Sequence, residues 1–387
     1  MVKFLSTAFV FLATVSAAVT APSSLEKRAQ CQSTLNVAVS VAQRLQSHYF
    51  NSGNGQYTGG SLWTDANTVE DLHNLMLANN SDEFSNVAAQ STIGRAALSN
   101  ANWNSIINGS NDDALWIVLA LWKIGDYMGA RGRDPTPYNN AANSIYNTIA
   151  GQWDNTCGGG VWWSTAHTYK NAITNQLFLL TSANGYLRFR NADWLANAQK
   201  TWNWLSASGM RNSQGLWNDG LDSSTCRNNG QTTWTYNQGV IASGLANLYA
   251  ATGNKTLLDQ AEITLDATIA HLSSNNILRE SCDNAASGGS VCNQDQQLFK
   301  VWTIGLWTKH VQYYLDWAND PARTAKYSGF LFSQASGVFH FGTNADDDIG
   351  SVWYAPNAGG SIFTPKTSAS GLEAHICTAK YGPCNTL

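Results

Sequence analysis

Residues 110–124 read SNDDALWIVLALWKI, and this stretch decides the fold class. Apolar residues fill nearly every position of 115–124, so a helix here is apolar on most of its sides. Such a helix has to be buried on several faces. Stretches within 173–180, 240–248 and 298–307 have the same character. The sequence therefore predicts a core of buried helices.

More amphipathic stretches, 192–205 and 256–272, lie between the buried ones. Polar positions also recur at a nearly fixed period, because Asp112, Asn175, Gln238 and Lys300 are separated by 63, 63 and 62 positions. A fixed period is typical of repeated structural units. With an earlier unit including 62–77 and a last one through 351–376, about six helical hairpins result. We expect an all-α fold, an (α/α)6 barrel with buried inner and amphipathic outer helices. The alternative is an irregular all-α domain.

The first 28 residues have the features of processing signals. Lys3 precedes an apolar run over 4–15, and small residues follow up to Ala21. This order is typical of a secretory signal peptide. Lys27-Arg28 then offers a dibasic processing site. We expect a signal peptide over 1–21, a short propeptide over 22–28 and a single (α/α)6 domain over 29–387.

Composition limits the possible partners. Charged residues make up 12% of the chain, about half the usual share. A net charge of −4 gives no attraction to nucleic acid or to an anionic membrane. No later segment is apolar enough to span a membrane, and residues 380–387 are polar, unlike a glycolipid-anchor signal. We expect a secreted, extracellular monomer with no membrane anchor and no nucleic-acid partner.

The cysteines agree with an oxidising compartment, which favours disulfides. Three N-glycosylation sequons, at Asn79, Asn108 and Asn254, also fit secretion. Sequence spacing suggests the following pairs, which leave Cys31 or another cysteine unpaired: Cys282–Cys292, Cys377–Cys384 and Cys157–Cys226.

Metal binding is not indicated. No Cys/His cluster suggests zinc. Asp346-Asp347-Asp348 lacks the ligand spacing of a calcium loop, so we interpret it as a solvated loop.

The strongest chemical signal is the adjacent pair Asp112 and Asp113 at the start of a buried helix. The structural alternative is a capping box between Ser110 and Asp113. Two carboxylates next to a buried helix are costly without a role, however, and Trp116 follows at once. Retaining glycosidases hold two carboxyl groups about 5–5.5 Å apart. Neighbouring residues at a helix start can reach that spacing.

Two close carboxylates do not easily ionise together, so one pKa rises and the other stays low. Asp112 lies nearer the positive helix end and should remain the anion. We therefore assign Asp112 as nucleophile and Asp113 as general acid/base. The starts of the other inner helices should converge on the pair at one end of the barrel.

The surrounding residues resemble glycoside hydrolase family 76, the endo-α-1,6-mannanases. Five blocks carry the resemblance in the family's order, between about residues 60 and 375: NDDALW (111–116), CGGGVWW (157–163), YKNAITNQLFL (169–179), WNDG (217–220) and TWTYNQG (233–239). The resemblance implies an (α/α)6 barrel that cleaves α-1,6-mannan with retention, with Asp112 as nucleophile, Asp113 as acid/base and no metal or organic cofactor. It also implies candidates for binding mannose or orienting the carboxylates: Trp116, Trp162, Trp163, Asn171, Asn175, Asp219, Trp234, Tyr236 and Asn237.

Two features depart from the family pattern. After Phe299-Lys300 the family often continues with Gly and then an Arg one turn on, whereas this chain has VWTIG over 301–305. Members anchored in the fungal wall carry an anchor signal that this chain lacks. We expect a soluble hydrolase, released or only loosely held by the wall. The alternatives are a transglycosidase acting on mannan-containing wall glycans and a catalytically inactive mannan-binding protein.

Overall fold

The computed structural model describes residues 30–282, 294–355, 361–385 and 387, without the side chains of 294–304. The signal peptide and propeptide expected over 1–28 lie outside this part. Within it, no helix is both long and apolar enough to cross a membrane.

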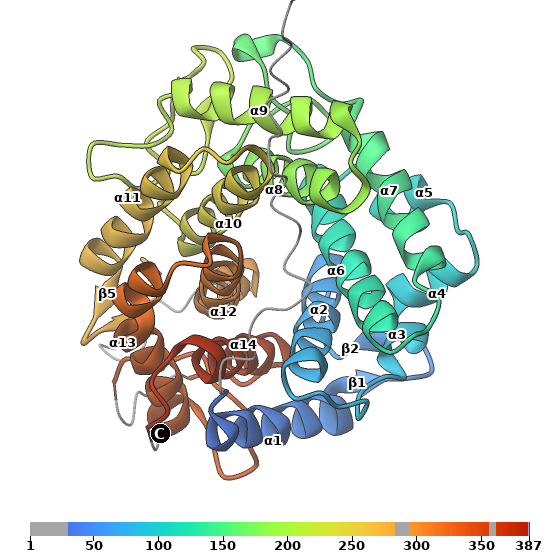
Figure 1. The fold of residues 1–387 in the computed structure, drawn as a ribbon, viewed down its shortest axis with the longest axis vertical. Coiled ribbons are helices and arrows are strands. Elements are labelled where there is room, and N and C mark those ends of the chain that lie inside the picture. Colours follow the sequence, from blue (N-terminus) through green and yellow to red (C-terminus); the bar gives the residue numbers. More distant parts are fainter. Residues whose placement is uncertain (1–29, 283–293, 356–360, 386) are drawn as a thin grey trace, which may run out of the picture.

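The described chain forms an inner ring of six helices (Figure 1). They are α2 (Leu62–Ala78), α6 (Asn111–Ala130), α8 (Ala172–Phe189), α10 (Thr235–Thr252), α12 (Gln294–Ala318) and α14 (Pro365–Tyr381). Each packs on the next, and α14 packs on α2, which closes the ring. Apolar residues cover most sides of α6, α8 and α10, as the sequence indicates, because these helices are buried all round. The (α/α)6 barrel is confirmed.

More amphipathic helices surround this ring. They are α1 (Gln32–Tyr49), the short α3 (Val87–Gln90) and α4 (Thr92–Leu98), α7 (Thr136–Ala150), α9 (Ala192–Ala207), α11 (Thr256–His271) and α13 (Pro321–Gly337). A further short helix, α5 (Trp103–Ile107), precedes α6. Loops between helices carry two-stranded antiparallel hairpins: β1 (Phe50–Asn51) with β2 (Gln56–Tyr57), β3 (Leu221–Asp222) with β4 (Arg227–Asn228), and β5 (Ser273–Ser274) with β6 (Ile277–Leu278).

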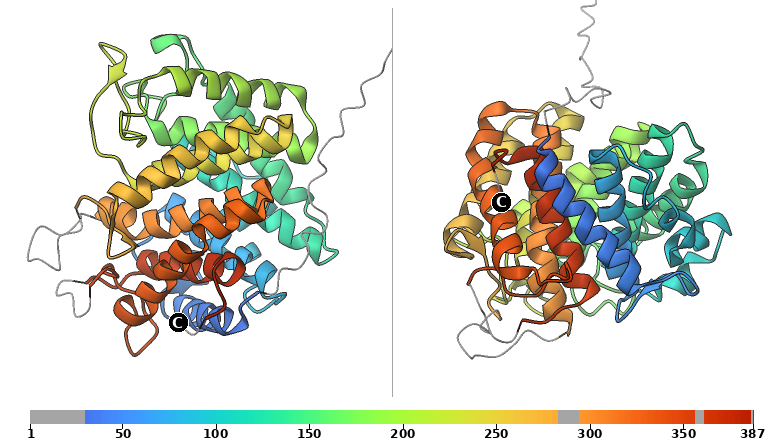
Figure 2. Two further views of the ribbon diagram at one scale, coloured as in Figure 1. Left: turned by 60° about the vertical axis from the view of Figure 1, so that its left-hand side comes forward. Right: turned by 90° about the horizontal axis from the view of Figure 1, so that it is seen from below.

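The two ends of the described chain meet where the barrel closes. Helix α1 lies beside α14, which the right-hand view of Figure 2 shows. Cys31, which precedes α1, forms a disulfide with Cys384, and its backbone N–H donates to the carbonyl of Ala379 at 2.9 Å. The expected Cys377–Cys384 pair is therefore wrong, and Cys31 is not the unpaired cysteine. Cys377 lies on the core side of α14 and is a buried free thiol.

The remaining cysteine predictions have different outcomes. Cys157–Cys226 is confirmed and joins the loop before α8 to the β3–β4 hairpin. The Cys282–Cys292 prediction involves Cys292, which lies outside the described residues.

The Asp346-Asp347-Asp348 segment differs in part from the solvated loop that we expect. Asp348 is buried and accepts two hydrogen bonds from Arg44 of α1, at 2.8 and 2.7 Å. Because this ion pair stabilises the charge of Asp348, the carboxylate can be buried. The last helical unit, which the sequence predicts over 351–376, also differs from the prediction, because its helix α14 begins only at Pro365.

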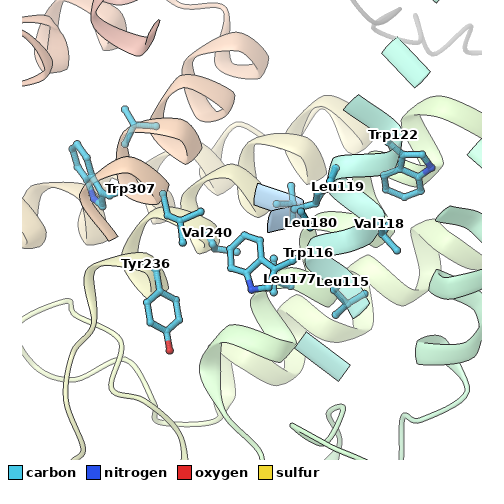
Figure 3. Close-up of a cluster of buried hydrophobic side chains, with 14 of the residues drawn as sticks. Leu115, Trp116, Val118, Leu119, Trp122, Leu177, Leu180, Tyr236, Val240 and Trp307 are labelled. Carbon is cyan, nitrogen blue, oxygen red and sulfur yellow. The ribbon is translucent and has the colours of Figure 1, made fainter. Parts of the chain in front are cut away.

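The centre of the barrel is filled by side chains rather than open. Figure 3 shows Trp116 among apolar residues of α6, α8 and α10. Its ring stacks on Trp63 of α2 with centroids 6.3 Å apart, and His310 of α12 lies 5.8 Å away. The described side chains therefore leave no open channel at this level of the barrel.

Candidate active site

Asp112 and Asp113 lie in the first turn of α6, and both are partly exposed. The Oδ1 atom of Asp112 accepts from the Ser110 hydroxyl at 2.9 Å, and its Oδ2 atom accepts from the indole Nε1 of Trp163 at 3.1 Å. The Ser110 side chain makes no capping hydrogen bond, so the capping-box alternative is wrong. Ser110 instead orients a carboxylate.

Burial and hydrogen bonding act on Asp112 in opposite directions. Burial raises the pKa of its carboxyl, whereas hydrogen bonds from Ser110, from Trp163 and from backbone amides lower it. The effect of burial is the largest, so the pKa of Asp112 is raised overall. This differs from the expectation of a low pKa for Asp112, which considered the helix end without the burial.

The Gly-rich loop over 157–163 lies against the start of α6. The Asn111 backbone N–H donates to the carbonyl of Trp163 at 3.0 Å, and its side-chain amide donates to the carbonyl of Trp162 at 2.8 Å. Asn175 of α8 holds the same loop, because its amide accepts from the Val161 N–H at 2.7 Å and donates to the Val161 carbonyl at 3.0 Å. These bonds fix the backbone that presents Trp163 to Asp112.

The base of this loop is fixed by a buried lysine. Lys170 Nζ donates to Asp154 Oδ1 at 2.5 Å and to the carbonyls of Thr156 and Gly159, both at 2.7 Å. The Trp162 indole donates to the other oxygen of Asp154 at 2.7 Å, and Lys170 lies over the Trp162 ring. Trp162 is therefore buried and held in place by this ion pair.

The glycines of the loop have a steric reason. Gly160 has a φ of 99°, and a Cβ there would lie 2.8 Å from the Trp204 ring. The backbone approaches this tryptophan too closely for any other residue.

A second edge of the site is formed before α8 and α10. Asn171 caps α8 by accepting from the Thr174 N–H at 3.3 Å and forms a backbone bridge with Gly220. Next to that bridge, Asp219 accepts from the Tyr169 hydroxyl at 2.6 Å. Burial raises the pKa of Asp219, and the Tyr169 bond opposes this shift. The result is a partly buried carboxylate with one strong donor.

The start of α10 contributes Tyr236. Burial raises the pKa of its phenol well above the usual range, and the charges of Asp219 and Asp112 raise it further. Tyr236 is thus a protonated O–H group within electrostatic range of both carboxylates. Figure 3 shows its side chain at the edge of the cluster around Trp116.

The next two residues of α10 are fully buried. Gln238 ties α10 to the WNDG block, because its amide accepts from the Trp217 N–H and donates to the carbonyls of Trp217 and Trp234. Neither amide atom of Asn237 has a hydrogen-bond partner among the described residues. Trp234 precedes α10 and is partly exposed.

The candidates thus fall into two groups. In the first group, Trp163 is exposed and bonds to Asp112, Asp219 and Trp234 are partly exposed, and Tyr236 is buried but within electrostatic range of Asp112 and Asp219. Those buried behind them are Trp116, Trp162, Asn171, Asn175 and Asn237.

Sequence reasoning did not single out several residues of this site. Lys170 and Tyr169 belong to the YKNAITNQLFL block (169–179). Because the chain carries few charges, a lysine just before a buried helix could have indicated that Lys170 has a structural partner. Asp154 offered no such signal. Neither did Glu280, whose Oε1 accepts from the N–H and the hydroxyl of Thr235, each at 2.8 Å. The side chains of Phe299 and Lys300 lie outside the described residues.

The fold and the site define an all-α barrel protein with a carboxylate pair at the starting end of its inner helices. A sequence model of glycosyl hydrolase family 76 matches residues 33–373, and the chain belongs to this family.

Two curated relatives have the same activity in their names. The mannan endo-1,6-alpha-mannosidase DCW1 of Eremothecium gossypii is 29% identical over 222 residues, which cover 53% of this chain and 47% of that protein. The mannan endo-1,6-alpha-mannosidase DFG5 of Saccharomyces cerevisiae is 25% identical over 271 residues, 66% of this chain and 56% of that protein. The chain spans about half the length of the curated relatives it matches.

Solved structures show the same fold. The GH76A alpha-1,6-mannanase from Salegentibacter sp. HEL1_6 superposes with a TM-score of 0.74 at 20% identity, covering 89% of this chain and 99% of that one. Dfg5 from Chaetomium thermophilum, in complex with glucosamine, gives a TM-score of 0.73 at 16% identity and covers 89% and 90%.

Proposed function

We propose that this protein is a secreted, endo-acting hydrolase that cleaves α-1,6-mannosidic linkages in mannan with retention of configuration. The observation that carries the proposal is the Asp112–Asp113 pair, presented at the barrel mouth with Trp163 bound to one of its carboxylates. Family membership and the names of the curated relatives support the substrate class.

The pair supplies both groups that a double displacement requires. Asp112 attacks the anomeric carbon, while Asp113 gives its proton to the oxygen of the leaving sugar. Asp113 then takes a proton from water, which hydrolyses the glycosyl ester and frees Asp112. The donors Ser110 and Trp163 aim the Asp112 carboxylate during both steps.

Three of the candidate residues suit contact with sugar. Trp163 exposes 45% of its surface beside Asp112, so its ring face is accessible to a pyranose. Tyr236 supplies a hydroxyl donor and Asp219 an acceptor for sugar hydroxyls. We assign the buried residues Trp162 and Asn175 to positioning the loop instead, since their polar atoms bind the protein itself.

Digestion of linear α-1,6-mannan tests the proposal. The wild type should release short oligosaccharides, and Asp112→Asn and Asp113→Asn should each lose at least about a thousandfold in kcat, as expected when a group of the reacting pair is removed. Asp134→Asn, at an exposed acid before α7, is the matched control and should keep full activity. Circular dichroism checks that all variants fold. Unchanged turnover in either pair variant would refute the assignment.

Adding an excess of an acceptor oligosaccharide separates two reactions of the same intermediate. A hydrolase gives mainly products with new reducing ends, whereas a transglycosidase lengthens the acceptor. No product of either kind from the wild type, with retained binding to mannan, would indicate an inactive mannan-binding protein.

A further inference from the structure

A cavity lies at the opposite end of the barrel from the aspartate pair. It has a volume of about 570 Å³, within the range of small-ligand sites. Its lining residues come mainly from the C-terminal halves of α6, α8, α10 and α12. Lys123 lies eleven positions after Asp112 on α6, which corresponds to about 16 Å along the helix axis. The cavity is therefore separate from the candidate active site.

One wall of this cavity is a preorganised chain of polar groups. Arg188 donates to both oxygens of Asp126, at 2.5 and 2.7 Å, and its Nε donates to Asn184 at 2.6 Å. Asn184 in turn donates to Asn247 at 2.8 Å. These residues connect α6, α8 and α10, so their amide groups are held in fixed positions.

Lys123 is the distinctive group of the lining. Its Nζ lies over the ring of Tyr313, 4.6 Å from the centroid. No carboxylate of the described residues lies within ion-pair distance of it, and burial lowers its pKa.

The acids that line the cavity are already paired: Asp126 with Arg188, Glu70 with Lys309 at 3.1 Å, and Asp316 with Lys380 at 2.5 Å. Among the described charged lining residues, the ammonium of Lys123 is thus the one without an opposite charge within ion-pair distance, although Asp126, Glu70 and Asp316 attract it from farther away. Lys123 is partly buried, and even partial burial of such a charge is costly. An anionic ligand would offset this cost.

We propose that this cavity binds a small ligand that carries both an anionic group and hydroxyl groups, of the size of an acidic or phosphorylated monosaccharide. The ammonium of Lys123 binds the anionic oxygen atoms. The fixed amides of Asn184 and Asn247 are positioned for hydroxyl groups, and the partly exposed indole of Trp317 offers an apolar face. A neutral sugar would leave the ammonium unpaired and should bind less tightly.

Isothermal titration calorimetry on the full mature chain tests this proposal, with four probes. D-Mannose 6-phosphate and D-glucuronate carry the two kinds of anionic group, a phosphate and a carboxylate, on a sugar. Inorganic phosphate supplies an anion without sugar hydroxyls, and D-mannose supplies sugar hydroxyls without an anion. We expect saturable binding of one molecule of at least one acidic sugar, at least tenfold tighter than of phosphate or mannose. Equal binding of phosphate or of mannose, or no binding of either acidic sugar, would overturn the proposal.

Variants then locate the site. Lys123→Gln should weaken binding at least tenfold, and Lys123→Arg should keep most of it. Lys255→Gln, at an exposed lysine before α11, is the matched control. Trp317→Ala provides a second lining variant that keeps Lys123, so a folding defect of Lys123→Gln leaves the test intact. The Asp112→Asn variant should bind as the wild type does. Unchanged affinity in both lining variants, or lost affinity in Asp112→Asn, would contradict a site at this end of the barrel.

Discussion

The indole Nε1 of Trp163 donates a hydrogen bond to Oδ2 of Asp112 across 3.1 Å, while 45% of the tryptophan remains exposed. Tryptophan side chains are mostly buried in proteins, whereas the Asp112 carboxylate holds Trp163 at the surface. Its backbone is fixed from beneath by Asn111 and Asn175. The geometry therefore links the charge of Asp112 to a ring available for stacking on a sugar.

Trp163→Phe should separate these two roles, because it keeps the ring and removes the donor. A hydrogen bond to a charged group is worth about 1.5–3 kcal/mol when buried, and this one is partly exposed, so we expect about a tenfold loss in kcat/KM. The bond stabilises the anion, so its loss raises the pKa of Asp112 and moves the acidic limb of the pH profile to higher pH. Trp202→Phe, on the outer helix α9, is the control. An unshifted acidic limb would show that the bond does not act on Asp112.

Asn175→Ala should destabilise the fold as well as the site. It leaves the N–H and the carbonyl of Val161 without their partners in a buried position. Each unsatisfied group costs about 1–3 kcal/mol, so we expect a loss of about 3 kcal/mol in the free energy of unfolding. Urea denaturation measures this, with the exposed Asn36→Ala on α1 as control. Equal midpoints for the two variants would refute the assignment of Asn175 to holding the loop.

Asp65 predicts a pH dependence of stability. Burial raises the pKa of its carboxyl to about 7, although the Tyr57 N–H donates to it. The pKa is about 3.9 in the unfolded chain, so the folded state binds the proton more tightly and its stability falls as pH rises from about 4 to 7. Asp65→Asn removes this dependence and should gain up to about 4 kcal/mol relative to the wild type at pH 7 compared with pH 4. Urea midpoints across this range measure the difference. A constant offset between the two proteins would contradict it.

Cys384→Ser should strongly destabilise the barrel, because the Cys31–Cys384 disulfide closes a loop of 353 residues. Loss of a long-range disulfide costs about 4 kcal/mol. Cys377→Ala is the comparison, since it removes only a buried thiol and should cost about 1 kcal/mol. Denaturant midpoints distinguish the two. If Cys377→Ala freed a reactive thiol at Cys384, the pairing would be wrong.

Much of the fold was predictable because burial on all sides leaves a plain signal. The continuous apolar run of α6 and the recurrence of Asn175 and Gln238 at nearly equal spacing give the inner ring directly. The ring closure was less accessible. It depends on the packing of α14 on α2, beside which α1 packs on α14, and no local pattern identifies Cys384 rather than Cys377 as the cysteine that meets Cys31.

The sequence blocks that surround the candidate site were recognisable, but the contacts that their residues make were not. Ser110 had the spacing of a helix cap, yet its hydroxyl binds the carboxylate of Asp112. Trp162 and Trp163 are neighbours in sequence with opposite environments, one tied to Asp154 inside the protein and the other exposed. These differences arise from the path of the loop backbone, which Lys170 fixes by donating to two of its carbonyls.

The stereochemistry of the first product tests the central claim most directly. Proton NMR can follow the anomeric signals of new reducing ends during cleavage of α-1,6-mannan, before mutarotation mixes them. Attack by Asp112 followed by attack by water involves two inversions, so the α-anomer should appear first. Initial formation of the β-anomer would contradict a double displacement at Asp112 and Asp113.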